Sequence, residues 1–196
     1  MNNIVGPEQL RQLPFLSGEN VDAPGIPFSK DILASHASTH TLIFTPRIQW
    51  LTLNGLRERL GVDPSQKEPC MYNQDWYVKE DFANLSLDGR WHFIRKHVLE
   101  EARAKAPDEI EAKLAQEESF PTAVTCAFTF FAYWFATGGE KLWKHDFVWC
   151  SDRDHNGDRI YVGRYEDPVG VNKNGFNIHR HLSLRPSYSA APEITS

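Results

Sequence analysis

The feature that most limits the fold is a long uncharged segment. Residues 119–139, SFPTAVTCAFTFFAYWFATGG, contain no Asp, Glu, Lys or Arg. A membrane-spanning helix needs about 20 apolar residues, but this segment is rich in Thr and poor in Leu, Ile and Val. Pro121 and Gly138 are typical residues for a helix start and stop. The sequence therefore predicts a buried helix over about residues 121–137, with Ala123–Ala136 packed on a sheet, and no membrane span.

Length and composition indicate one globular domain. The chain has 196 residues and a mass of 22.5 kDa, with 41% hydrophobic and 24% charged residues. Residues 1–27 are rich in Pro and Gly and are expected to form an arm along the surface. Residues 28–186 then form the domain. Residues 187–196, rich in Ser, Ala and Pro, are expected to be a flexible tail.

Local patterns predict a mixture of helices and strands. Ser29 and Thr52 are suitable N-caps for two of the helices. The predicted helices, besides the buried one, are residues 30–35, 53–60 and 106–118. The predicted strands are residues 39–45, 76–78, 90–98, 146–151, 159–165 and 175–184. Because helices and strands do not alternate regularly, the order favours an α+β fold with an antiparallel sheet.

Cysteine usage and the first residues bear on the compartment. Cys70, Cys126 and Cys150 have no CxxC spacing and indicate free thiols in a reducing environment. The first residues, MNNIVGPEQLRQLPFL, lack the basic region and apolar run of a secretory leader. We therefore expect a cytoplasmic protein. The sequence has no P-loop, GxGxxG, GxSxG or HExxH pattern, which removes the commonest nucleotide-binding, serine-hydrolase and metalloprotease classes.

The segment Asp152–Asp158, DRDHNGD, lies between two strand-like runs. Asn156-Gly157 is the strongest short signal for a hairpin turn, so we expect the two runs to pair through it. Alternating oxygen ligands with a glycine at the sixth position also resemble the start of an EF-hand calcium loop. The resemblance ends at the twelfth position, where an EF-hand has Glu and this chain has Gly163. Asp152 and Asp154 remain candidate metal ligands.

The strand predicted near the C-terminus has one polar face, which we expect to contribute little to the core. Alternation along the strand places five polar side chains on that face: Asn177, His179, His181, Ser183 and Arg185. Two imidazoles two residues apart on a strand point to the same side and can ligate one divalent metal ion. His179 and His181, with Asp152 or Asp154 from the hairpin, are therefore the candidate ligands.

The sequence His181-Leu-Ser183-Leu resembles one motif of the two-histidine phosphoesterases, His–hydrophobic–Ser/Thr–hydrophobic. The resemblance implies that two histidines transfer protons while hydroxyls hold the phosphate. The partner would be His36 or His40, although the hydroxyl after His40 falls one position early. The candidate catalytic residues are His179, His181, Ser183 and His40.

Charge is distributed unevenly along the chain. The net charge of −5 and pI of about 5.9 argue against a general polyanion binder. Residues 159–185 nevertheless have a local charge of +3, interleaved with Tyr, Phe and His. Such a surface suits nucleic acid, a phosphate ligand or an acidic peptide. The candidate ligand-binding residues are Arg164, Asn177, His179, His181 and Arg185.

Two functions follow from these patterns. The first is a non-catalytic binding or accessory protein that contacts an anionic partner through this basic C-terminal sheet. The alternative is a small hydrolase, phosphoesterase-like or metal-dependent, that uses His179 and His181. A hydrolase requires the histidines to converge in a cleft, whereas a binding surface requires them to be spread over a shallow face.

Overall fold

A computed structural model describes residues 4–63, 68–164, 175–180 and 183–195. These residues form the predicted α+β fold, with two mixed sheets. The α-helices are α1 (Pro7–Leu10), α2 (Lys30–His36), α3 (Leu53–Leu60), α4 (Pro107–Glu111) and α5 (Ala123–Thr137). Short 3-10 helices are η1 (Pro14–Leu16), η2 (Asp81–Asn84) and η3 (Glu100–Ala102). The strands are β1 (Ile4–Val5), β2 (His40–Phe44), β3 (Trp91–Arg95), β4 (Glu118–Ser119), β5 (Phe147–Arg153), β6 (Arg159–Arg164), β7 (Phe176–Arg180), β8 (Tyr188–Ser189) and β9 (Glu193–Ile194).

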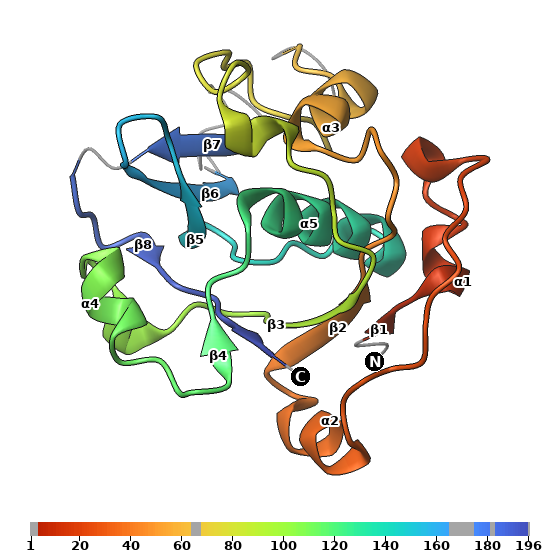
Figure 1. The fold of residues 1–196 in the computed structure, drawn as a ribbon, viewed down its shortest axis with the longest axis horizontal. Coiled ribbons are helices and arrows are strands. Elements are labelled where there is room, and N and C mark those ends of the chain that lie inside the picture. The colour runs from red at the N-terminus through yellow and green to blue at the C-terminus, as the bar shows by residue number, and fades with distance from the viewer. Residues whose placement is uncertain (1–3, 64–67, 165–174, 181–182, 196) are drawn as a thin grey trace.

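Helix α5 lies at the centre of the fold, between the two sheets (Figure 1). Thr122 caps it by accepting a hydrogen bond from the Thr125 backbone N–H, and Gly138 ends it in the left-handed conformation at φ 73°. Every residue from Ala123 to Tyr133 is buried. None of the helices among the described residues is both long and apolar enough to cross a bilayer.

The five-stranded sheet has the order β1-β2-β3-β9-β4. Strands β1 and β2 are parallel, whereas the other neighbours are antiparallel. In the β2–β3 register, Leu42 is opposite Phe93 and His40 is opposite Arg95. Side chains of directly opposite residues share a face of the sheet, so the register brings His40 and Arg95 together.

The four-stranded sheet has the order β7-β6-β5-β8 and contains the predicted hairpin. Strands β5 and β6 pair antiparallel, with Val148 opposite Val162. At the turn, the Gly157 N–H donates to the Asp154 carbonyl at 2.9 Å, and the Asp154 N–H donates to the Asp158 carbonyl at 3.0 Å. Gly157 has φ 86°, the left-handed position of a three-residue hairpin loop. The turn therefore depends on a residue that tolerates positive φ.

Both faces of the four-stranded sheet are covered. Val148 and Cys150 face the main core that contains α5. Phe147 and Trp149 alternate with them and join Tyr161 and Tyr188 in a separate set of ring contacts, which we call the aromatic cluster. Ala102 of η3 and Ile110 of α4 pack in the same hydrophobic group. The sheet thus has no fully solvent-exposed face for a flat binding surface.

Both ends of the described chain, expected as a surface arm and a flexible tail, contain residues that pair with the sheets and are buried. In the N-terminal segment, β1 pairs with β2, and Leu10 and Leu13 are buried. In the C-terminal segment, β8 and β9 join different sheets, and Ala190 and Ala191 between them are buried. The small side chains and proline of the C-terminal segment give no periodic sequence pattern. The segment is held by pairing with distant strands and by close packing.

Two other predicted elements have different extents. The expected strand at residues 76–78 is a turn. The expected helix at residues 106–118 is α-helical only over Pro107–Glu111. A five-residue helix is too short to be stable alone, so packing of the buried Ile110 against the aromatic cluster sets its extent.

A buried polar network ties β9 to the five-stranded sheet. His92 Nδ1 lies 2.5 Å from Glu193 Oε2, while His92 Nε2 lies 3.2 Å from Asp88 Oδ1 and 3.1 Å from Thr45 Oγ1. Arg90 also donates to Glu193 at 3.2 Å. Burial disfavours a charged His92, but hydrogen bonds to Asp88 and Glu193 outweigh it and raise the pKa of His92. The network therefore favours the protonated form of His92, whose ring lies between two carboxylates.

The hairpin turn gives a testable prediction about Gly157. A Gly157→Val variant is expected to lose about 1 kcal/mol or more of unfolding free energy, because a β-branched residue is disfavoured at positive φ. No other atom lies within 4 Å of a Cβ built there, so the effect comes from the backbone. Gly25→Val is the matched control, since Gly25 also has open space but no positive φ. Urea denaturation of both variants measures the difference, and equal stabilities would contradict the turn.

The polar network predicts a pH-dependent stability. A group whose pKa is raised on folding stabilises the fold below its unfolded pKa, about 6.5 for His, and loses that contribution as pH rises through the folded pKa. The stability difference between wild type and His92→Gln should therefore be largest near pH 5.5 and shrink towards pH 9. Urea denaturation across this range measures it. A difference that stays constant with pH would show that His92 is uncharged in the fold.

Candidate functional site

Strand β7 contains only some of the residues predicted to form the polar face. Ile178 faces the main core and is fully buried, and His179 points to the opposite side, into contact with the aromatic cluster. The predicted alternation is therefore correct within the strand. The strand ends at Arg180, so Ser183 and Arg185 lie beyond it and are exposed. His181 lies outside the described residues.

His179 packs against the aromatic cluster and not on an open polar face. Its ring stacks on Tyr161 with centroids 5.3 Å apart, and it lies 5.5 Å from the Phe147 ring. The hydroxyl of Tyr161 donates to that of Tyr188 at 3.2 Å. Burial, and then the positive charge of Arg185, lower the pKa of His179 to about 4. At neutral pH His179 is therefore an uncharged ring, suited to packing more than to proton transfer near pH 7.

Carboxylates neutralise most described cations of the C-terminal sheet. Arg164 forms a two-pronged pair with Glu68, with the Arg164 Nε 2.8 Å from both carboxylate oxygens. Arg180 lies 3.2 Å from Asp154. Asn177 is buried, and its amide donates to the Gly175 carbonyl at 2.9 Å. Among the described residues, Arg164 and Arg180 thus do not form a continuous cationic surface.

The hairpin carboxylates have structural partners. Asp152 Oδ2 accepts a hydrogen bond from the Ala123 N–H at the start of α5, at 2.5 Å. Asp154 Oδ1 accepts from the backbone N–H groups of Asn156 and Asp158, both at 2.9 Å. Within the part of the chain that the structure describes, no three His, Cys, Asp or Glu residues are grouped as a metal site requires.

His36 and His40 do come together, although they belong to different elements. His36 ends α2 and His40 begins β2, and their rings meet edge to face with centroids 5.1 Å apart. Arg95 and Lys96 lie at the adjoining end of β3. We call these four residues the cationic corner. Burial first, and then the charges of His36, Arg95 and Lys96, lower the pKa of His40 to about 4.

Two nitrogen atoms in the cationic corner are buried without a hydrogen-bond partner among the described residues: His40 Nε2 and Arg95 Nε. They belong to residues that are directly opposite in the β2–β3 register, and the His40 side chain is only 1% exposed. A buried polar atom left unpaired costs about 1–3 kcal/mol. A small polar ligand that hydrogen-bonds to both atoms would recover this free energy.

A second arrangement surrounds the tip of the hairpin. Glu80, just before η2, is 9% exposed and binds His155 twice: Oε1 lies 2.6 Å from Nδ1, and Oε2 accepts the His155 backbone N–H at 3.0 Å. A hollow of about 340 Å³ opens beside them and is lined by Lys79, Glu80, Asp81, Arg153, Asp154 and His155. Sequence reasoning missed this pair. The Asn156-Gly157 turn signal placed His155 at a hairpin tip but could not show that Glu80 lies against it.

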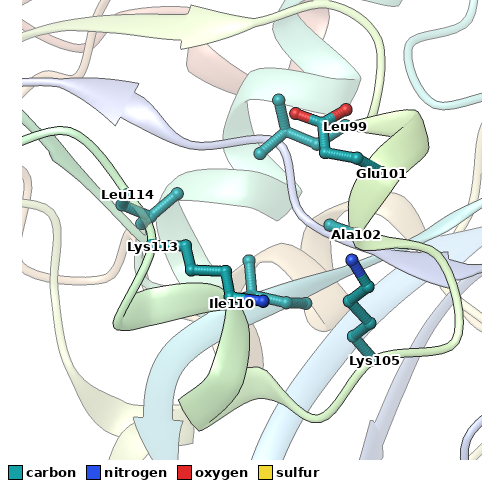
Figure 2. A pocket seen from close by; sticks show the side chains of 7 residues that line it. All are labelled: Leu99, Glu101, Ala102, Lys105, Ile110, Lys113 and Leu114. Carbon is teal, nitrogen blue, oxygen red and sulfur yellow. The ribbon is translucent and has the colours of Figure 1, made fainter.

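A second hollow, of about 120 Å³, lies between η3 and α4 (Figure 2). Leu99, Ala102, Ile110 and Leu114 form apolar walls, and Figure 2 shows side chains of charged residues around them. Since one water molecule occupies about 30 Å³ in the liquid, the space holds only a few small groups. It is a shallow gap in the layer that covers the aromatic cluster.

The packing of His179 gives a prediction opposite to that for an open polar face. His179→Ala removes two ring contacts and should lower the unfolding free energy by about 1–2 kcal/mol, whereas His179→Phe should retain most of it. His97→Ala, at an exposed position, is the matched control and should change stability by less than about 0.5 kcal/mol. Thermal unfolding compares the three. An unchanged His179→Ala variant would restore the polar-face hypothesis.

Comparisons with known proteins add no relative to these observations. No family model, no curated protein and no solved structure matches the chain. Two arrangements are therefore the candidate sites: the cationic corner at the β2–β3 end, and the Glu80–His155 pair beside its hollow.

Proposed function

We propose that the protein is a non-catalytic binding protein for inorganic phosphate, which it holds at the cationic corner. The sequence favoured an anionic partner on the C-terminal sheet, but Arg164 and Arg180 of that sheet are paired with Glu68 and Asp154. The single observation that carries the proposal is the pair of buried, unpartnered nitrogens His40 Nε2 and Arg95 Nε. A phosphate group has the donor and the acceptor that these two atoms lack.

The hydrogen-bonding pattern of His40 defines what it can bind. Thr39 Oγ1 donates to the His36 carbonyl at 3.2 Å, so at 2.8 Å it accepts the proton of His40 Nδ1. In the neutral ring, Nε2 then carries a lone pair and needs a donor. Arg95 Nε is a donor and needs an acceptor. Hydrogen phosphate supplies both, since it has a P–OH group and ionised oxygens.

The surrounding charges favour an anion over a metal ion. After burial, His36, Arg95 and Lys96 all act to lower the pKa of His40, as positive charges close to the ring do. A divalent cation would be repelled by this field, whereas an anion is attracted. The negative net charge of the whole chain disfavours a long polyanion such as nucleic acid. Inorganic hydrogen phosphate fits both conditions, because it is a small anion that keeps its P–OH group at pH 8.

Isothermal titration with inorganic phosphate tests the proposal. Wild type should bind phosphate at pH 8. Sulfate, which has no proton at this pH, should bind only as the pH falls and His40 Nε2 becomes protonated. Arg95→Met should weaken phosphate binding about 10-fold or more, because a charged hydrogen bond contributes roughly 1.5–3 kcal/mol. His40→Phe should weaken it as well.

Arg47→Met is the matched control, because Arg47 is an exposed arginine outside the corner. It should leave phosphate affinity unchanged. Equal losses in Arg47→Met and Arg95→Met would mean that phosphate binds through general electrostatics. Absence of phosphate binding to wild type between pH 6 and pH 8 would also reject the proposal.

A further inference from the structure

The hydrogen bonds of Thr39 connect the end of α2 to the His40 ring. Thr39 Oγ1 donates to the His36 carbonyl at 3.2 Å and lies 2.8 Å from His40 Nδ1. The Thr39 backbone N–H donates to the same carbonyl at 3.0 Å, which holds residue 39 against the helix end. A hydroxyl has a single proton to donate, and the carbonyl takes it. Thr39 Oγ1 therefore accepts the proton of His40 Nδ1.

Thr39 thereby decides which nitrogen of His40 accepts a hydrogen bond. With a pKa of about 4, His40 is a neutral ring at pH 8 and carries its one proton on Nδ1. Its Nε2 bears a lone pair and is buried without a partner among the described residues. A ligand oxygen that carries a proton can donate to Nε2. A fully ionised oxygen brings a second lone pair, so the two atoms repel and Nε2 stays unpaired.

The presence of a proton separates anions that are otherwise alike. Inorganic phosphate is mainly hydrogen phosphate at pH 8 and has a P–OH group, whereas sulfate has no proton. A phosphomonoester loses its last proton with a pKa of about 6, so at pH 8 it has none either. All three anions then carry about two negative charges, so attraction to the cations of the corner does not separate them. Arg95 Nε does not separate them either, because it donates to any ionised oxygen.

We infer that Thr39 sets the ligand class of the cationic corner by holding the proton of His40 on Nδ1. The corner then accepts an oxyanion that carries a proton, such as hydrogen phosphate, and rejects fully ionised ones, such as sulfate and phosphomonoesters. This inference rests on the phosphate site proposed above. Thr39 is a positioning residue, since it acts on the ligand through the His40 ring.

Isothermal titration at pH 8 with phosphate, sulfate and methyl phosphate tests the inference. Thr39→Val removes the oxygen that accepts from Nδ1, so the ring proton is free to move to Nε2 and donate to any ionised oxygen. Phosphate affinity should stay within about 3-fold of wild type, because Nε2 still has a partner. The preference for phosphate over the other two anions should fall about 10-fold or more. Thr39→Ser keeps the hydroxyl and should retain the wild-type preference.

Nuclear magnetic resonance of the unliganded protein reads the tautomer directly, through couplings between the ring nitrogens and carbon-bound protons. The His40 proton should be on Nδ1 in wild type and Thr39→Ser, and on Nε2 in Thr39→Val. Ser38→Ala is the matched control, since it removes an exposed hydroxyl one residue earlier. It should leave both the tautomer and the preference for phosphate unchanged. Circular dichroism checks folding, and Thr39→Ala is the second variant if Thr39→Val unfolds.

The outcomes separate the inference from the proposed function. If wild type binds phosphate but binds sulfate and methyl phosphate equally well, the phosphate site stands and the inference is overturned. The same holds if the His40 proton of wild type is on Nε2, or if Thr39→Val keeps the wild-type preference. If wild type binds none of the three anions, the proposed function is rejected and the inference is rejected with it.

Discussion

The burial of α5 is the constraint on which the rest of the structure depends. A helix without a polar face must be covered on all sides, and its first eleven residues, Ala123 to Tyr133, are all buried. One sheet alone covers one side of a helix. The second sheet, α1 and α3 supply the other contacts, which is why the two terminal segments are packed and not loose. The ring contact of Phe130 with Phe176, at 4.8 Å, is one point where helix and sheet meet.

The predictable parts of the fold are those with local signals. Ser29 and Thr52 are N-caps in the structure, as the sequence indicated, and the helices after them begin where expected. The hairpin follows the Asn156-Gly157 signal. Strands β1, β8 and β9 are two residues long, so they have no period that a pattern search can detect. Each forms by pairing with a longer strand that is distant in sequence: β1 with β2, β9 with β3 and β8 with β5. Such pairing is visible only in the folded chain.

In the candidate sites too, local sequence patterns predicted some features, whereas contacts between distant elements determined the others. Alternation gave the correct side for His179 but could not show that a layer of η3 and α4 covers that side of the sheet. The sequence offered His36 or His40 as the partner of His181 and gave no sign that the two lie beside each other. The turn after α2 nevertheless brings the rings together. Glu80 and His155 are far apart in sequence, and neither has a motif. Each failure arises where a contact between distant elements, and not a local pattern, determines the environment.

The placement of β8 and β9 has a consequence for how the fold is lost. Tyr188–Ser189 pairs with β5 in one sheet, and Glu193–Ile194 pairs with β3 and β4 in the other. Only three residues link the two strands, and all three are buried. Displacing either strand therefore pulls on the other. The two sheets therefore cannot open independently. Backbone amides in both should exchange with solvent deuterium through one shared global opening, as in a single cooperative unit.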